Sequence, residues 1–313
     1  MSDSVPAVGI LVLNYHQPEI TLACVRRLLE REGDQARILW LENDASATRE
    51  DALRCLEASG LPWVEIDGSG SELPKAGTLG FIPIPENRGY AGGNNVGARL
   101  CHRAGVPWVW ILNNDTLLEA GSSEDLRLAA LARPEVGVWG TTIRNRDGQV
   151  YSGGRLKLKD FASEWVRTAE DLEGDPLSFV SGCSLFFRSD LGARLNFLAE
   201  SYFLYYEDPA FTMDIREQGY LASMVSSVEI FHEEAFTTGY RSDLMEFYNR
   251  RNRWYFIQKY FPDHLQVQVR RRWYRYQNLV FRRKWRRFMV EQMAYRDFLA
   301  GKMGKTDHCF SQG

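Results

Sequence analysis

Short apolar segments alternate with helix-forming segments through the first 115 residues of the chain. Strands are predicted at 8–13, 37–41, 63–66, 81–84 and 109–112, and helices at 18–31, 47–58 and 92–103. The apolar runs are continuous, which is typical of strands buried on both faces of a sheet. Strands that are joined in this way by helices form right-handed crossover units. The pattern therefore predicts an α/β fold around a mostly parallel sheet.

Beyond residue 115 the pattern becomes mixed. Further strands are predicted at 136–141, 177–187 and 225–232, a hairpin at 144–155 with its turn at Asp147-Gly148, and helices at 209–219, 244–260 and 263–299. A chain of 313 residues can form one large domain or two modest ones. We therefore expect helices that flank the sheet, followed by a C-terminal helical extension.

The five cysteines include no pair spaced as C-x-x-C, and their odd number fits no closed set of disulfides. A reducing cytoplasm is therefore the expected location. The first residues lack the basic and then apolar pattern of a signal peptide. No apolar run approaches the roughly 20 residues that cross a bilayer.

Positive charge is concentrated near the C-terminus. The net charge is −3, but residues 270–287 hold nine basic and no acidic residues, so the rest of the chain carries −12. At helical spacing, one face holds Trp273, Tyr274, Phe281, Trp285 and Phe288, and the other holds Arg271, Arg275, Arg282 and Arg286. Such a helix can lie on an anionic membrane surface, or it can pack its aromatic face on the protein. Nucleic acid is not an expected partner, because no recognised binding motif accompanies the charge.

Polar residues follow three of the predicted strands. Asn113-Asn114-Asp115 comes directly after the apolar run 109–112, and Tyr15 and Asp44 follow the first two strands. Ligands of open α/β sheets bind outside the carboxyl ends of the strands. There Asp115 can hold a divalent cation, Tyr15 can stack on a base, and Asp44 can accept a hydrogen bond from a nucleoside. Local alternatives remain, because Asn and Asp also form turns and helix caps.

A glycine-rich segment at 86–97 precedes and opens a predicted helix. It includes Asn87, Arg88, Gly93 and Asn95 but matches neither the dinucleotide fingerprint nor the P-loop. Its amides could face an anion or a sugar. The alternative is a tight turn with close helix packing.

Glu207-Asp208-Pro209 follows the aromatic run 202–206. Apolar surroundings raise the proton affinity of a carboxylate, which suits a general base. Asp208 before Pro209 is also good capping chemistry for a helix start. His232 ends the last predicted strand and could be a cation ligand or a local hydrogen-bond partner.

The order of these motifs resembles family 2 inverting glycosyltransferases, in particular bacterial rhamnosyltransferase-like members that build surface polysaccharides. The motifs are V-L-N-Y, E-N-D-A-S, E-N-R-G-Y-A-G-G-N-N-V-G, L-N-N-D, V-S-G-C, E-D after an aromatic run, a strand-end His and Y-N-R-R-N. The resemblance covers about residues 8–262. It implies a GT-A fold over 1–262, with a nucleotide-sugar-binding half up to about 117 and an acceptor-binding, catalytic half over 118–262. Residues 263–313 are then a basic amphipathic helical tail.

The resemblance also implies roles for particular residues. Leu13, Tyr15 and Asp44 would contact the nucleoside, and Asn87, Arg88, Gly93, Asn95 and Asn114 would complete the donor site. Asn113 and Asp115 stand at the two ends of the family's D-x-D metal motif, with His232 as a third ligand of Mg²⁺ or Mn²⁺. Because Asn113 is neutral, metal dependence stays open, and Arg251 or its neighbours Arg250 and Arg253 could neutralise the diphosphate instead. Asp208, beside Glu207, would be the catalytic base.

The expected activity is inverting transfer of a sugar from a dTDP-rhamnose-like or UDP-sugar donor. The acceptor would be a hydroxyl of a glycan or a lipid-linked sugar in cell-surface polysaccharide synthesis. The basic tail would then hold the enzyme peripherally on the inner face of the plasma membrane. A sugar-phosphate nucleotidyltransferase would need a Gly-rich basic loop after the first strand, where residues 14–18 stand instead. A membrane-docked nucleotide- or carbohydrate-binding protein with a decayed site is the non-enzymatic alternative.

Overall fold

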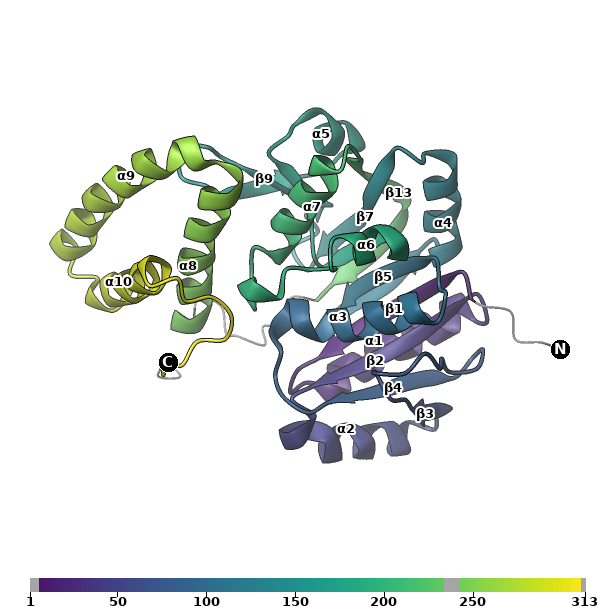
Figure 1. The fold of residues 1–313 in the computed structure, drawn as a ribbon. Helices are drawn as coiled ribbons and strands as arrows, with labels where there is room; N and C mark the ends of the chain where they lie inside the picture. Colours follow the sequence, from purple (N-terminus) through teal and green to yellow (C-terminus); the bar gives the residue numbers. More distant parts are fainter. Residues whose placement is uncertain (1–5, 234–241, 311–313) are drawn as a thin grey trace.

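The first half of the chain forms alternating strands and helices, as predicted (Figure 1). The computed structural model describes residues 6–233 and 242–310. The strands here are β1 (Val8–Asn14), β2 (Ala36–Asn43), β3 (Trp63–Glu65), β4 (Leu79–Ile84) and β5 (Trp108–Asn113), and the helices are α1 (Pro18–Glu32), α2 (Ala45–Ser59) and α3 (Gly89–Arg103). All five strands are parallel, in the order β3-β4-β2-β1-β5.

The second half extends this sheet with strands of both directions. Its elements are β6 (Thr116–Ala120), α4 (Ser123–Ala132), β7 (Val136–Asn145), β8 (Val150–Tyr151), β9 (Gly153–Leu156), β10 (Ser163–Val166), α5 (Ala169–Gly174), β11 (Ser178–Val180), β12 (Ser184–Arg188), α6 (Ser189–Arg194), the 3-10 helix η1 (Glu200–Tyr202), α7 (Glu207–Glu217) and β13 (Leu221–His232). The sheet continues β5-β12-β7-β13-β6. β12 is antiparallel to both of its neighbours, and β13 is parallel to β7. The predicted hairpin is present, because β7 pairs with β8 across a turn at Gly148.

The apolar segment 177–187 divides between two sheets. β11 belongs to a small antiparallel sheet of order β10-β9-β11, whereas β12 joins the main sheet. Between these two strands, residues 181–183 form a loop that contains Ser181-Gly182, and we call this interruption of the strand the break at 181–183. This break lies next to the residues predicted to be catalytic.

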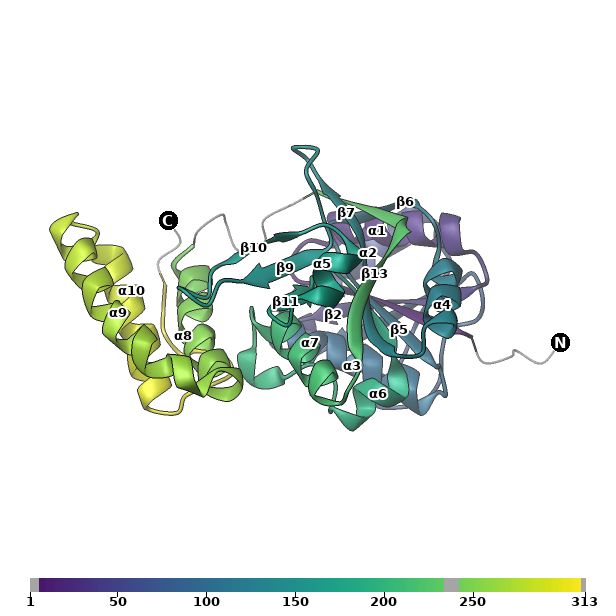
Figure 2. The same ribbon diagram turned by 90° about the horizontal axis from the view of Figure 1, so that it is seen from above.

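Helices cover both faces of the main sheet (Figures 1 and 2). On one face, Val12 and Trp40 pack in a core with Leu28 of α1, and α2 and α4 contribute to the same core. On the other face, Leu11 packs in a core with Leu100 of α3, and α6 and α7 contribute there. The strands read as continuous apolar runs because both of their faces are buried.

The C-terminal region is a set of three helices that extends away from the sheet (Figure 1). They are α8 (Asp243–Tyr260), α9 (Pro262–Phe281) and α10 (Trp285–Leu299). The prediction of one helix over 263–299 is wrong, because the chain reverses between α9 and α10 with Arg283 at φ 54°. The reversal lets α10 pack on α8, where Trp254 contacts the rings of Tyr295 and Phe298. No helix within 6–233 and 242–310 combines the length and apolar character needed to span a bilayer.

Candidate active site

Three adjacent strands end at the edge of the sheet where the donor was predicted to bind. β1 lies between β2 and β5, and Leu13 is in register with both Leu41 and Asn113. Tyr15, Asp44 and the segment 113–115 therefore leave the sheet side by side. Beneath them a buried polar group that the sequence did not single out, Glu42, accepts hydrogen bonds from Asn14, Trp40 and Thr48 at 2.8, 2.8 and 2.5 Å.

Asp44 does not cap α2, which was the alternative reading of its sequence context. It precedes the helix at φ 86°, and in the described part of the chain its side chain accepts no capping hydrogen bond. Instead its carboxylate lies 3.4 Å from His16 Nε2. The Asp44 carboxylate is thus available at the strand edge.

The glycine-rich segment forms a tight turn. Asn87 Oδ1 accepts hydrogen bonds from Asn43 and from the Gly89 amide at 3.1 and 2.9 Å, and the Arg88 amide donates to Asn43 at 2.9 Å. The Arg88 guanidinium lies 3.4 Å from Glu200. These contacts agree with the turn that the sequence left open as an alternative, and they hold the start of α3 against β2.

Three residues expected to contact the donor are buried. Asn95 is fully buried, and its amide group bonds the backbone of Leu198 in both directions. A Cβ at Gly93 would come within 2.5 Å of Leu13, so Gly93 allows α3 to approach β1. Arg251 is buried over the rings of Phe247 and Tyr248. These contacts show packing roles for the three residues, and their contact with the donor stays a prediction.

Asp115 and His232 lie together at this edge. His232 Nε2 is 3.2 Å from Asp115 Oδ1, and His232 Nδ1 is 2.8 Å from the Tyr151 hydroxyl. Burial opposes protonation of His232, but Cys183 and Asp115 outweigh it and raise the pKa of the imidazole. Asn114 donates to Thr21 at 3.0 Å, so its amide supports the loop.

The side chains around Asp115 limit how a divalent cation could bind at this edge of the sheet. Within the described residues no three His, Cys, Asp or Glu side chains are grouped to hold a metal ion. Asp115 and His232 form a smaller pair of O and N donors, and Asp115 lies two residues along the chain from Asn113. Such a set suits a cation that takes its remaining ligands from substrate phosphates, as Mg²⁺ commonly does.

Glu207 and Asp208 open α7 beside the break at 181–183. The helix starts at Glu207, so Asp208 is not its cap, and Asp208 Oδ2 accepts a hydrogen bond from the Gly182 amide at 3.0 Å. Burial raises the pKa of Asp208, and burial together with the charge of Asp208 raises the pKa of Glu207. Tyr90, which the sequence did not single out although it lies in the E-N-R-G-Y motif, donates to the Gly182 carbonyl at 2.5 Å.

The loop 181–183 connects the two groups of acidic residues. Gly182 bonds Asp208, and the next residue, Cys183, accepts a hydrogen bond from the Asn113 amide at 3.1 Å. Tyr151 makes a second connection, because it lines a cavity with Asp208 and its hydroxyl bonds His232. Asp115 and Asp208 are therefore connected through the loop 181–183 and through Tyr151 and His232.

The cavity beside Asp208 has a volume of about 880 Å³. Aromatic side chains line much of it, namely those of Tyr151, Phe161, Trp165, Phe179, Tyr205 and Tyr206. Four arginines also line it, from α8, α9 and α10. The cavity thus combines a carboxylate with raised proton affinity, apolar walls and positive charge.

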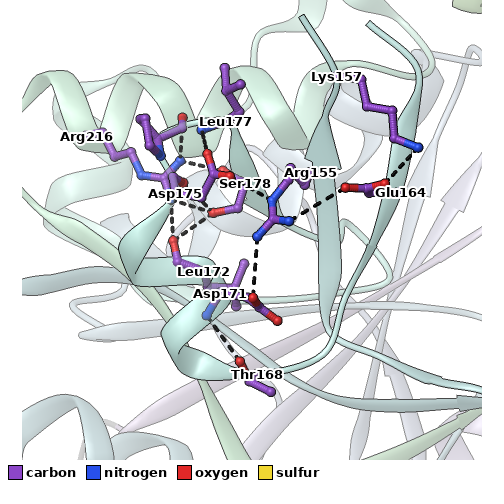
Figure 3. Close-up of polar contacts among 11 residues, drawn as sticks. Arg155, Lys157, Glu164, Thr168, Asp171, Leu172, Asp175, Leu177, Ser178 and Arg216 are labelled. Atoms are coloured by element: carbon purple, nitrogen blue, oxygen red, sulfur yellow. Dashed lines mark hydrogen bonds and ion pairs between the residues drawn. The ribbon is translucent and has the colours of Figure 1, made fainter.

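Ion pairs hold the small sheet that forms one wall of this cavity (Figure 3). Arg155 on β9 pairs with Asp175 at 2.7 Å and lies 3.4 Å from Asp171 and 3.6 Å from Glu164. Arg216 on α7 donates to the backbone of Leu172 at 2.6 Å. Because α7 also carries Asp208, these contacts position the wall relative to the predicted base.

Comparison with solved structures supports the same fold. A mannosyltransferase from Pyrobaculum calidifontis, in complex with GDP-Man and Mn²⁺, superposes with a TM-score of 0.52 at 15% identity, covering 97% of this chain and 77% of that one. TarS 1-349 from S. aureus in complex with UDP-GlcNAc gives a TM-score of 0.52 at 12% identity, covering 94% and 81%. At these identities the likeness shows the fold, which is that of GT-A glycosyltransferases.

The family of the chain is identified by sequence comparison. An N-acetylglucosaminyl-diphospho-decaprenol L-rhamnosyltransferase of Mycobacterium tuberculosis is 30% identical in an alignment of 203 residues that covers 55% of this chain and 66% of that relative's length. Residues 108–301 match the family described as glycosyl transferase family group 2. This match includes β5, the break at 181–183, α7 and the three C-terminal helices. The chain therefore belongs to glycosyl transferase family group 2.

Proposed function

We propose that this protein is an inverting glycosyltransferase that moves a sugar from a nucleotide-sugar donor onto a hydroxyl of a lipid-linked sugar, in the synthesis of a cell-surface polysaccharide. The observation that carries the proposal is the position of Asp208. Its half-buried carboxylate lines the aromatic cavity and accepts a hydrogen bond from the loop 181–183, and the same loop contacts the strand edge at Asn113. A donor at the edge and an acceptor in the cavity would meet there.

The donor site that we propose lies along the ends of β1, β2 and β5. Leu13, Tyr15 and Asp44 would contact the nucleoside, with a dTDP-rhamnose-like or UDP-sugar donor as the expected class. Asn113 and Asp115 would face its diphosphate. This arrangement follows the register of the three strands and the general position of ligands in open α/β sheets.

Asp115, His232 and the amide of Asn113 are the residues that would hold a divalent cation together with the phosphate oxygens of the donor. A bound Mg²⁺ or Mn²⁺ supplies positive charge that stabilises the leaving diphosphate. The close approach of Asp115 and His232, at 3.2 Å, is compatible with both side chains turning to one ligand.

The chemistry then follows from the position of Asp208. Its carboxylate removes the proton from the acceptor hydroxyl, and the resulting oxygen nucleophile attacks the anomeric carbon from the face opposite the diphosphate. The bond from that carbon to the phosphate oxygen breaks, and its electron pair leaves with the diphosphate. One displacement inverts the anomeric centre. A raised pKa makes Asp208 a stronger base than an exposed aspartate.

The acceptor and the location are further parts of the proposal. The name of the rhamnosyltransferase relative includes a sugar that is linked to a lipid through a diphosphate, N-acetylglucosaminyl-diphospho-decaprenol. Around the turn between α9 and α10, Trp273, Tyr274, Phe281 and Trp285 are exposed, Phe281 by 89%. With the surrounding arginines and Lys284, they fit an anionic membrane surface. We therefore place the enzyme on the cytoplasmic face of the membrane, with residues 1–262 as the catalytic unit and 263–313 as the docking unit.

Transfer to a short-chain prenyl diphosphate-linked N-acetylglucosamine tests the proposal. Purified protein is incubated with dTDP-rhamnose or UDP-sugars, with and without Mg²⁺ or Mn²⁺, and the product's anomeric configuration is read by NMR. We expect transfer with inversion. If no sugar nucleotide is transferred or hydrolysed under any of these conditions, the protein is instead a nucleotide- or carbohydrate-binding protein whose active site has decayed.

A further inference from the structure

Four arginines line the same cavity as Asp208. Arg250 and Arg253 come from α8, Arg275 from α9 and Arg287 from α10, and we call these four residues the arginine cluster. Positions 245, 246, 249, 250 and 253 of α8 all line the cavity. Their spacing of three to four residues places them on one face of the helix. The C-terminal helices therefore turn a basic surface toward the cavity.

Two glutamates neutralise the arginine cluster only in part. Glu291 lies 3.3 Å from Arg250 and 3.2 Å from Arg275. Glu246 lies 3.3 Å from Arg250 and 3.2 Å from Arg287. Four guanidinium groups thus share two carboxylates as ion-pair partners, while the carboxylates of Asp160 and Asp208 also line the cavity.

Arg253 is the member without a carboxylate partner in the described part of the chain. Its side chain is 6% exposed. One guanidinium nitrogen donates to the Asp160 carbonyl at 3.1 Å, but the buried Nε has no hydrogen-bond partner within residues 6–233 and 242–310. Burial and then the nearby Arg275 lower the pKa of Arg253 to about 10, so it still carries its charge at neutral pH. A buried cation that lacks a counter-charge is unfavourable, and a bound anion would remove the cost.

A phosphate group fits this environment. The guanidinium group presents several N–H donors in a planar fork that matches phosphate oxygens. Asp115, which we assign to the donor diphosphate, is not among the residues that line the cavity. The anion that would bind the arginine cluster is therefore part of the acceptor.

We propose that the arginine cluster binds the phosphate groups of the acceptor and so fixes the acceptor hydroxyl at Asp208. The ligand class is a sugar linked to a phosphate or diphosphate. Arg287 follows the exposed Trp285 by two residues on α10. A lipid chain attached to the phosphate would thus leave the cavity beside the membrane-facing side chains. The identification of the ligand as an acceptor rests on the proposed function, whereas the anion site itself does not.

Calorimetric titration of the full chain with inorganic pyrophosphate and with farnesyl diphosphate tests the proposal. EDTA is present throughout, so that no cation at Asp115 can bind the probe. The variants are Arg253→Met and Arg275→Met, and the control is Arg270→Met, which removes an exposed arginine of α9 that does not line the cavity. We expect both cluster variants to lose at least about tenfold in affinity, which is the effect of removing a charge-assisted hydrogen bond. The control should bind as the wild type does.

Two further measurements distinguish loss of the anion site from loss of the folded structure. Each variant should keep the wild-type thermal transition and the wild-type affinity for whichever of UDP, dTDP or GDP the protein binds. Tighter binding of farnesyl diphosphate than of pyrophosphate identifies a lipid-linked ligand, and equal binding identifies a water-soluble phosphate ligand. Wild-type protein that binds neither probe, or cluster variants that fold and bind both probes normally, would overturn the proposal. Intact binding in a protein that transfers no sugar would instead overturn only the proposed function.

Discussion

Asp208 stands in a sequence context that fits two roles, which do not exclude each other. A carboxylate before a proline is typical of a helix start, and a carboxylate after an aromatic run is typical of a base in an apolar site. In the structure the helix begins one residue earlier, and the Asp208 carboxylate bonds the Gly182 amide of a distant segment. The structure therefore argues against the capping role, and the role of Asp208 as a base stays a prediction.

Replacing Asp208 by Asn should remove the base and keep the fold. The Asn side-chain carbonyl can still accept the hydrogen bond from Gly182, so thermal unfolding should change little. The turnover number should fall by about 10²–10⁴, because a positioned base contributes that much. Steady-state kinetics and donor titration are the measurements, with Asp190→Asn, an exposed aspartate paired with Arg188, as the control. Turnover near the wild-type rate would remove Asp208 from the mechanism.

Glu207 makes stability depend on pH in a direction opposite to that of most acidic residues. Burial raises its pKa above the ordinary 4.5, so the unfolded chain loses this proton before the folded protein does. In that window the folded state binds more protons, and stability therefore falls as pH rises. Denaturation by urea at about pH 5 and about pH 8 measures the fall. Glu207→Gln should reduce it, whereas Glu119→Gln at an exposed position should not; equal falls in all three proteins would refute the assignment.

Helix α3 depends on a glycine at its first residue. Gly89 has φ 71°, and a Cβ there would come within 2.2 Å of the Phe203 carbonyl oxygen. The backbone amide of the next residue, Tyr90, donates a hydrogen bond to the same carbonyl oxygen at 2.8 Å. The start of the helix is therefore packed against the aromatic segment that leads to Asp208.

Gly89→Ala should destabilise the protein by more than backbone strain alone. Gly148 provides the matched control, because it has φ 73° but an added Cβ there would have no neighbour within 4 Å among the described residues. The control substitution should cost about 1–2 kcal/mol for the left-handed conformation. At Gly89 the steric conflict should add about 1–3 kcal/mol. Equal losses in the free energy of unfolding of the two variants would mean that the contact with Phe203 relaxes freely.

The helical tail shows where periodicity misleads. The apolar and basic spacing over 263–299 favours one long helix, but the residues 282–284 turn the chain back. The signal that decides this is tertiary, because Val290 and Ala294 become buried against Phe247 and Tyr248 of α8. No local pattern in the tail records the position of α8.

Binding to anionic vesicles tests the exposed residues at this turn. Replacing Phe281 and Trp285 together by Ser should weaken flotation with phosphatidylserine-containing liposomes at low salt, because exposed apolar surface and basic charge act jointly. Leu131→Ser, at a comparably exposed leucine of α4, should leave flotation unchanged. Vesicle binding that is absent in the wild type, or equal in both variants, would exclude the tail as a membrane contact.

Across the whole molecule, the sequence predicts the parallel half well because each strand there is a continuous apolar run with polar residues at its end. It predicts the second half less well. β9, β10 and β11 are short and partly polar, and their pairing depends on contacts such as those of Arg155 with α5. The sequence predicts that the ends of β1, β2 and β5 lie side by side, which the structure confirms, whereas Tyr90, Tyr151 and Arg275 reach the proposed active-site region only through the tertiary fold.

Nucleotide binding tests the donor edge as a unit of the whole fold. Thermal shifts with dTDP, UDP and GDP, each with and without Mg²⁺ or Mn²⁺, should stabilise the protein by mass action for the base that it recognises. Asp115→Ala should weaken this stabilisation, and Glu119→Gln should preserve it. Unchanged donor affinity in Asp115→Ala, with and without cation, would argue against a site at the end of β5.

The chain reversal between α9 and α10 has a consequence for how such an enzyme would search for its substrate. Phe281 and Trp285 flank the reversal, and Arg287 lies one half-turn farther along α10. An anchor and a phosphate site built into one helical hairpin would confine the encounter to two dimensions. Turnover would then follow the number of acceptor molecules per unit of bilayer area, so that diluting them with inert lipid at constant bulk concentration would slow the reaction.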